Sequence, residues 1–333
     1  MLRLALPSDG ELYEPSLAFL KACGLPLERA SARRYTGVLG GLRGATVLLQ
    51  RMADITHKVQ EGSAELGIVG LDRFLEYRRE ESPVALVMED LGFGSCELVV
   101  AVPDTWLDIS SMDDLADLSL ELRQQGKQLR VATKYPRLVE RYFLSRGINY
   151  FTLVPASGAL EAAPAAGYAD MIADISSTGT TLRENRLKTL EDGTILSSQA
   201  CLIGNLKLLA ERPEALRLAR AVLERMEAYL MAGNYYRITS NIRGRSPEEV
   251  ASHILSRPEL SGLQGPTVAP VFGADSEGWY EVSLIVPREQ LLEAVDHLRH
   301  AGATDIASVQ VNYLFRERCH AYEHLLQLLG REG

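Results

Sequence analysis

Length, composition and charge indicate a globular protein of two or three domains. The chain has 333 residues, of which 46% are hydrophobic and 24% are charged, so it has enough apolar material for sizeable cores. The formal net charge is −9 and we find no basic stripe, so nucleic acid is not expected as a partner. An acidic chain can still bind anionic substrates through local arginines, backbone amides or a divalent cation.

The cysteines and the N-terminal segment argue against several further classes. The four cysteines, Cys23, Cys96, Cys201 and Cys319, show no CxxC spacing, which disfavours a zinc site or a redox pair. The apolar stretch Leu2–Leu6 is too short for the core of a signal peptide. No window approaches the roughly 18 apolar residues of a membrane-spanning helix. We therefore expect a cytoplasmic protein without a membrane partner.

Short apolar strands alternate with helical stretches along the first two thirds of the chain. Strands are predicted at Leu2–Leu6, Leu66–Val69, Glu97–Val102, Arg130–Ala132, Phe151–Val154 and Met171–Ile175. Helices are predicted at Glu14–Ala22, Phe74–Tyr77 and Arg137–Arg146, from about Thr181, and at Arg212–Met231. This alternation favours α/β layers with largely parallel sheets.

The pattern changes after Gly233-Asn234, which end the long helical stretch. From Tyr235 onward the predicted elements are a strand, a helix (Pro247–Leu255), two strands (Thr267–Phe272 and Trp279–Val286), a helix (Arg288–Ala301) and a strand (Ile306–Tyr313). The order βαββαβ is that of a ferredoxin-like module. A last amphipathic helix is predicted at Cys319–Leu329, to pack on its own domain or to contact another subunit.

A run of small hydroxyl residues follows the predicted strand Met171–Ile175. This run, Ser176–Thr181, contains Gly179 and leads into a helix start. Amides at a helix start and nearby hydroxyls together form an anion cradle that suits a phosphate monoester. Asp174, at the carboxyl end of the strand, lies where it can accept hydrogen bonds from ribose hydroxyls. Taken alone, the loop is equally explained as a capped helix after a buried strand.

The wider segment from Glu161 to Leu182 resembles the signature of the ATP phosphoribosyltransferases. In that signature a Glu stands six residues before a Gly, followed by a small residue, an aliphatic residue, an Asp and a Ser/Thr-Gly-x-Thr-Leu run. The matching positions are Glu161, Gly167, Ala169, Ile172, Asp174, Ile175, Thr178, Gly179, Thr181 and Leu182. Further blocks that resemble the family are Ala5-Leu6-Pro7 with Gly10, Gln50–Ile55, Glu65–Asp72, Leu91–Cys96, Val131–Pro136, Ala200–Ile203, Pro266–Val268 and Ala301–Ala303.

The resemblance implies two α/β lobes of the periplasmic-binding-protein type, with the active site in the cleft, followed by a ferredoxin-like regulatory domain. The first lobe is expected at residues 1–100 and 183–232, and the second lobe, with the phosphoribosyl loop, at 101–182. The regulatory domain is expected at 233–315 and a C-terminal helix at 316–333. A chain with this module is similar to the long form of the family.

The resemblance also implies the reaction. The family transfers the phosphoribosyl group of phosphoribosyl pyrophosphate to an adenine nitrogen of ATP and releases pyrophosphate, which is the first step of histidine biosynthesis. Magnesium takes part, histidine inhibits the long form, and long-form enzymes are homo-hexamers. Because the transition state resembles an oxocarbenium ion, the protein has mainly to position the substrates and stabilise leaving-group charge.

Roles for individual residues follow from the same resemblance. The residues expected to bind the phosphoribosyl group are Asp170, Ser177, Thr178, Gly179, Thr180 and Thr181. Glu161 and Asp174 are the expected catalytic residues, which hold the ribose hydroxyls or a bridging Mg²⁺ ion. The residues expected on the nucleotide side are Arg51, Asp72 and Tyr135. Asp170 is alternatively a surface residue at a strand start, and Tyr135 part of an ordinary turn. The residues expected to form the histidine pocket are Pro266, Thr267, Gly302 and Ala303.

One departure from the family concerns its cations. The family carries a Lys and an Arg around the first glycine of its N-terminal motif, where this chain has Asp9 and Glu11. It often has a basic residue where this chain has Glu97. Arg33 or Arg34 could then hold pyrophosphate instead. A catalytically impaired regulatory homologue therefore stays open as one alternative. A solute-binding protein is a second alternative, because it shares the two-lobed fold.

Overall fold

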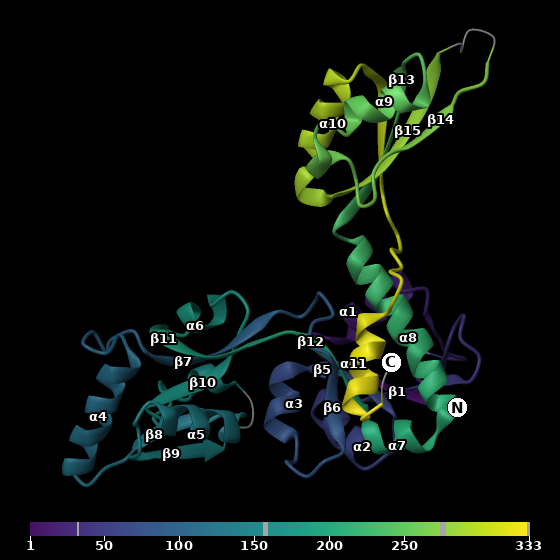
Figure 1. Ribbon diagram of the computed structural model, residues 1–333. Coiled ribbons are helices and arrows are strands. Elements are labelled where there is room, and N and C mark those ends of the chain that lie inside the picture. The colour runs from purple at the N-terminus through teal and green to yellow at the C-terminus, as the bar shows by residue number, and fades with distance from the viewer. Residues whose placement is uncertain (32, 156–158, 274–277, 332–333) are drawn as a thin grey trace. The chain divides into compact units, whose positions relative to one another are not determined.

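The computed structural model describes the chain except for residues 32, 156–158, 274–277 and 332–333. The chain divides into two compact units, one made of Met1–Arg220 with His324–Gly333 and the other of Ala221–Glu323. Two sheets lie in the first unit and one in the second (Figure 1). In the part of the chain that is described, no helix is both long enough and apolar enough to cross a membrane.

The first lobe is built on a sheet with the strand order β2-β3-β4-β1-β5-β12-β6. Its strands are β1 (Leu2–Pro7), β2 (Leu27–Glu28), β3 (Thr36–Leu39), β4 (Ala45–Gln50), β5 (Leu66–Gly70), β6 (Val84–Met88) and β12 (Ala200–Asn205). Its helices are α1 (Tyr13–Ala22), α2 (Met52–Gln60), α3 (Leu71–Tyr77) and α7 (Leu206–Glu211). β1 pairs in parallel with both β4 and β5, so the carboxyl ends of these three strands lie at one edge of the sheet.

Close packing of α2 on β5 fixes the centre of this lobe. Every residue of β5 is buried, which fits a central strand that is covered on both faces. A Cβ atom on Gly67 would lie 2.9 Å from side-chain carbons of Ile55 and Val59 on α2. Glycine at this position therefore lets the helix approach the strand closely.

The second lobe is built on a sheet with the strand order β11-β7-β10-β8-β9. Its strands are β7 (Cys96–Pro103), β8 (Leu129–Thr133), β9 (Phe151–Pro155), β10 (Met171–Ser176) and β11 (Leu187–Ser198). Its helices are α4 (Met112–Gln124), α5 (Pro136–Ser145), α6 (Thr180–Glu184) and the 3₁₀ turn η1 (Leu160–Ala162). β8, β9 and β10 run in parallel, whereas β7 and β11 are antiparallel to their neighbours.

The boundary between the lobes differs from the one expected from the sequence. β7 and β11 both belong to the second sheet, so residues 183–198 lie in the second lobe and the chain returns to the first at β12. The sequence around Asp192-Gly193 looks like a break, and no strand was predicted there. A bulge between Thr189 and Thr194 accommodates this break while the strand continues its pairing with β7.

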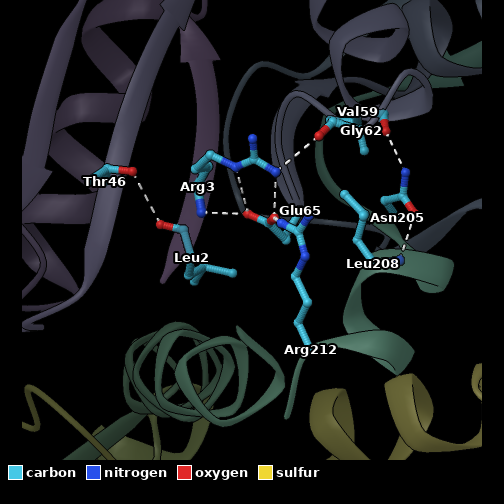
Figure 2. A network of polar contacts seen from close by, with 9 residues as sticks. All are labelled: Leu2, Arg3, Thr46, Val59, Gly62, Glu65, Asn205, Leu208 and Arg212. Carbon is cyan, nitrogen blue, oxygen red and sulfur yellow. Dashed lines mark hydrogen bonds and ion pairs between the residues drawn. The ribbon is translucent and has the colours of Figure 1, made fainter. Parts of the chain in front are cut away.

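A buried carboxylate joins the start of β1 to the helices that follow β12 (Figure 2). Glu65 is fully buried and accepts hydrogen bonds from the Arg3 backbone N at 2.7 Å, from Arg3 Nη2 at 2.6 Å and from Arg212 Nη1 at 2.7 Å. Arg3 Nη2 also donates to the Gly62 carbonyl at 2.9 Å. Multiple partners of this kind offset the cost of removing a charge from water.

The second unit confirms the predicted βαββαβ module. After α8 (Pro213–Ala232) the elements are β13 (Tyr235–Arg243), α9 (Pro247–Ile254), β14 (Thr267–Pro270), β15 (Trp279–Pro287), α10 (Leu291–His300) and β16 (Ala303–Gln310). The strand order is β14-β15-β13-β16 and every neighbouring pair is antiparallel, as in ferredoxin-like folds. Buried side chains of α9 and α10, among them Ile254 and Leu298, form its core with Ile238 and Leu284 of the sheet.

The C-terminal helix α11 (His320–Leu328) packs on its own chain. Its first amides, those of His320 and Ala321, donate to the Glu227 carboxylate of α8 at 3.0 and 2.6 Å. Farther along, His324 Nδ1 lies 3.2 Å from the Val87 carbonyl oxygen of the first lobe. This helix therefore makes contacts within its own chain, and a contact with another subunit stays a prediction.

Candidate active site

Both lobes place their candidate residues at the carboxyl ends of strands. In the first lobe Arg51 follows β4 and Asp72 lies two residues after β5. In the second lobe Lys134 follows β8, and the loop Ser176–Thr181 begins at the last residue of β10. This is the edge at which open α/β sheets bind ligands. Arg51 is exposed at the start of α2, and its expected contact with nucleotide stays a prediction.

The loop Ser176–Thr181 is a compact turn that presents hydroxyl groups to solvent. Gly179 is the N-cap of α6 and has φ = 70°, a conformation that side chains disfavour. Ser176 Oγ accepts a hydrogen bond from the Gly179 amide at 3.0 Å. Thr178 Oγ1 and Thr180 Oγ1 are 3.0 Å apart, and Arg183 Nη2 donates to Thr180 Oγ1 at 3.2 Å. The loop thus combines hydroxyls with a nearby guanidinium, which suits an anionic ligand.

Asp174 lies near the end of β10 among other charged groups. The backbone N of Ile175 donates to its Oδ1 at 2.9 Å. Burial raises the pKa of Asp174, and the charge of Glu161 raises it further, whereas the charges of Lys134 and Arg73 lower it. Glu161 is therefore close enough to Asp174 to act on its pKa, and the expected roles of the two carboxylates stay a prediction.

Lys134 and Arg73 join the candidate site near Asp174, although the sequence analysis did not single them out. Each had a signal in the sequence. Lys134 directly follows the predicted strand at Arg130–Ala132 and its Thr, and Arg73 adjoins Asp72 in the turn after another strand. A cation that follows a strand end is placed to reach a ligand at that edge.

The Asp174–Glu161 pair fits a magnesium ion only together with substrate oxygens. In the described ranges no group of three or more His, Cys, Asp and Glu residues is arranged to hold a metal by itself. Mg²⁺ commonly binds one or two carboxylates and completes its shell with substrate phosphates and water. A cation would also offset the repulsion between the two carboxylates. This repulsion raises the pKa of Asp174 less than burial does.

Asp72 and Tyr135 are buried and bonded to each other, which argues against the expected contact with nucleotide. Asp72 is 5% exposed and Tyr135 is 1% exposed. Tyr135 Oη donates to Asp72 Oδ2 at 2.7 Å, and Ser198 Oγ donates to Asp72 Oδ1 at 2.8 Å. The Arg73 guanidinium lies 4.5 Å from the centre of the Tyr135 ring. Burial and the charge of Asp72 raise the pKa of Tyr135, so the phenol stays protonated.

Asp170 does not lie at the loop. It precedes β10, at the end of the strand opposite the loop, and six extended residues span about 20 Å. Its Oδ1 accepts from Arg130 Nη2 at 2.6 Å and its Oδ2 from the Arg130 backbone N at 2.8 Å. The expectation that Asp170 binds the phosphoribosyl group is therefore wrong for this geometry, and Asp170 is an ion-paired residue at a strand start.

Glu97, one of the departures from the family, lies beside the loop. It is the second residue of β7 and pairs in register with Ser176, the first residue of the loop. Glu97 is exposed. A negative charge at this place disfavours an anion in the loop.

The residues of the expected histidine pocket lie at opposite edges of the module's sheet. Thr267 begins β14 and Ala303 begins β16, and β15 and β13 separate these strands by about 14 Å. Thr267 lines a cavity of about 1090 Å³ with Arg237, Ser283 and Arg316. Gly302 lines a different cavity of about 880 Å³. Within one module the two segments therefore do not form a single pocket. The sequence could not show this, because it does not reveal which strands lie at the edges of a sheet.

Known proteins resemble this chain along nearly its whole length. A family model described as ATP phosphoribosyltransferase matches residues 51–228, and one described as HisG, C-terminal domain, matches residues 232–313. ATP phosphoribosyltransferase 1, chloroplastic, of Arabidopsis thaliana is 38% identical over 335 residues, which cover 99% of this chain and 81% of that protein. The ATP phosphoribosyltransferase of Bradyrhizobium diazoefficiens is 35% identical over 330 residues, 98% of each chain.

A solved structure supports the assignment of the two-lobed core. A chain of the ATP phosphoribosyl transferase (HisG:HisZ) complex from Thermotoga maritima superimposes with a TM-score of 0.52 and 26% identity. The match covers 99% of that chain and 68% of this one, so the remainder of this chain has no counterpart there. From the family models, the full-length relatives and the fold, this chain belongs to the ATP phosphoribosyltransferase family.

Proposed function

We propose that this protein transfers the phosphoribosyl group of phosphoribosyl pyrophosphate to an adenine nitrogen of ATP, with release of pyrophosphate, as the first step of histidine biosynthesis. The observation that carries the proposal is the site of the second lobe. There a hydroxyl-rich loop with Gly179 in the left-handed conformation adjoins Asp174 and Glu161, in a chain related over its full length to enzymes named for this activity.

The residues of the second lobe divide the work of binding. In this proposal Ser177, Thr178, Gly179, Thr180 and Thr181 bind the 5′-phosphate, and Asp174 with Glu161 binds the ribose hydroxyls. The adenine nitrogen attacks the anomeric carbon as its bond to pyrophosphate breaks, and the bonding electron pair leaves with pyrophosphate. Carboxylates near the ribose then favour the positive charge that develops on the ring, and nearby cations favour the leaving group.

Magnesium, histidine and assembly belong to the same proposal. Asp174 and Glu161 would hold Mg²⁺ together with substrate oxygens, and the ion would neutralise charge on the pyrophosphate. The match of residues 232–313 to the C-terminal family domain supports histidine as an inhibitor that acts through the module. We propose a homo-hexamer as the assembly, as the resemblance to the long form implies.

A steady-state assay tests the proposal. Purified protein with ATP, phosphoribosyl pyrophosphate and Mg²⁺ is expected to form phosphoribosyl-ATP, with less product after chelation of the metal or addition of histidine. The variant Asp174→Asn is expected to form less product, because it loses the carboxylate charge that is proposed to act at the ribose and to hold Mg²⁺. Tight binding of phosphoribosyl pyrophosphate without any product would instead indicate an impaired homologue. The same fold without binding or turnover of either substrate would favour a solute-binding protein.

A further inference from the structure

Helix α3 of the first lobe completes the first turn of α5 in the second lobe. α5 begins at Pro136, which has no N–H, and the side chain of its N-cap residue Tyr135 caps no amide. The next two amides, of Arg137 and Leu138, donate to Glu76 Oε1 at 3.1 Å and to Glu76 Oε2 at 3.0 Å. A carboxylate is favourable there because the helix dipole is positive at its start. The cap of α5 thus comes from the other lobe.

The same two helices exchange a second cap in the opposite direction. Arg137 Nη1 donates to the carbonyl oxygens of Glu76 at 3.0 Å and of Arg78 at 2.6 Å. These carbonyls belong to the last turn of α3 and to its C-cap, where a cation is favourable. Glu76 is only 3% exposed, so water competes little for its bonds.

One turn earlier, Asp72 binds two further segments of the second lobe. Residues four apart share a helix face, so Asp72 and Glu76 project from α3 in the same direction. Asp72 accepts from Tyr135 Oη, in the turn between β8 and α5, and from Ser198 Oγ, at the end of β11. Ser198 Oγ in turn accepts from the Asp72 amide at 3.0 Å. Of the two hydroxyls, that of Ser198 lies where the chain leaves the second lobe for β12.

The turn that α3 holds also carries a residue of the candidate site. The Tyr135 amide donates to Thr133 Oγ1 at 2.9 Å, so the turn is compact. Lys134 lies in this turn, and Arg73 lies on α3 itself. Both are close enough to Asp174 to lower its pKa. Each of the two segments that these contacts join therefore carries one cation near Asp174.

We propose that Asp72 and Glu76 are positioning residues, which set the alignment of the two lobes through an α3–α5 clamp. The clamp comprises Asp72, Glu76, Tyr135, Arg137 and Ser198. Its role rests on the proposed function in one respect, since phosphoribosyl transfer requires groups of both lobes to meet at the reacting atoms. Misalignment of reacting groups lowers the rate of transfer even where each substrate still binds.

Two variants loosen the clamp and one matched variant does not. Tyr135→Phe removes the bond to Asp72 and keeps the ring. Glu76→Gln removes one of the two hydrogen bonds by which Glu76 caps α5. Tyr142→Phe is the control, because Tyr142 lies on the same helix and its hydroxyl donates to Asp192 within the second lobe. We expect kcat to fall at least about tenfold in the first two, with the Kd of phosphoribosyl pyrophosphate within about twofold of wild type. Tyr142→Phe is expected to keep kcat.

A distance measurement tests the clamp without relying on activity. Spin labels at Lys21→Cys on α1 and Gln124→Cys on α4 report the separation of the lobes. The background is Cys96→Ala, because Cys96 pairs opposite Ser198 and a new hydroxyl there would lie beside the clamp. Both label positions are exposed. We expect one narrow distribution of distances in the parent and in Tyr142→Phe, and a broader or shifted one in Tyr135→Phe and Glu76→Gln.

The outcomes separate this proposal from the proposed function. Unchanged distances in Tyr135→Phe and Glu76→Gln overturn the clamp. Changed distances with an unchanged kcat overturn the positioning role of the clamp. A raised Kd of ATP with an unchanged kcat also overturns that role, because it would indicate direct contact with the nucleotide. Absence of phosphoribosyl-ATP with the parent protein defeats the proposed function, while the label distances still decide whether the clamp exists.

Discussion

At the scale of single residues, the loop hydroxyls are the groups that distinguish a ligand site from a capped turn. Thr178 and Thr181 are exposed, and the hydrogen bonds of the Thr178 hydroxyl, to Thr180, lie within the exposed loop. Hydrogen bonds to a charged group contribute about 1.5–3 kcal/mol each. We expect Thr178→Val with Thr181→Val to raise the KM of phosphoribosyl pyrophosphate by one hundredfold or more, on the order of 3 kcal/mol in total, with an unchanged melting temperature. An unchanged KM in a steady-state assay would show that the loop is structural.

Removing the charge of Glu97 is expected to lower the KM of phosphoribosyl pyrophosphate rather than raise it. Its place beside Ser176 puts a negative charge next to the proposed phosphate site. Two like charges about 4 Å apart repel by about 1 kcal/mol in water. Glu97→Gln is therefore expected to lower the KM of phosphoribosyl pyrophosphate up to about fivefold, less so at high salt. Glu121→Gln, an equal change of charge on α4, should leave KM as it is, and equal effects of both variants would contradict a local role.

At the scale of elements, the start of α4 responds to pH through one carboxylate. Asp114 accepts hydrogen bonds from Ser110 and Ser111, and the Ser111 side chain accepts from the Asp114 amide in a capping box. The backbone amide of Ser110, followed by the hydroxyl and amide of Ser111, lowers the pKa of Asp114 to about 2. Because the folded pKa lies below the unfolded value of about 3.9, the carboxylate stabilises the fold above that pH and loses this effect as pH falls through about 2.

Thermal melting of Asp114→Asn at several pH values checks this expectation. The variant is expected to melt below wild type at pH 7, and the difference should shrink between about pH 4 and pH 2. Ser111→Ala, which removes the other half of the capping box, should cost about 1 kcal/mol with a weaker dependence on pH. A difference for Asp114→Asn that stays constant down to pH 2 would rule out the carboxylate as its origin.

At the scale of the whole molecule, the Glu65 network ties the first strand to the start of the helix that leads into the second unit. Arg3→Met removes three side-chain bonds in this network, two of them to a fully buried carboxylate, and we expect a loss of about 3–5 kcal/mol. Arg212 is half exposed and makes one bond to Glu65, so Arg212→Met should cost about 1 kcal/mol or less. Urea unfolding of both variants measures the ranking, and equal losses would contradict it.

The sequence predicted the elements whose signals are local. The βαββαβ order, the strand before the loop and the helix at Arg137–Arg146 all follow from apolar periodicity and from turn residues. The strands β2, β3, β4, β6 and β12 were not predicted, although they flank the predicted β1 and β5 on both sides of the first sheet. Their patterns are short, and pairing with distant strands rather than local propensity makes them strands.

The sequence alone determined the segment to which we assign the chemistry, because Glu161, Gly167, Asp174 and the loop lie within one contiguous stretch whose order is visible without a fold. Only the tertiary structure decided what faces that segment. It brought Lys134 and Arg73 to Asp174, moved Asp170 to the opposite end of its strand and buried Asp72 against Tyr135. These relations depend on strand pairing and on contacts between lobes, and such contacts join residues 40 to 126 positions apart, beyond the reach of any local pattern.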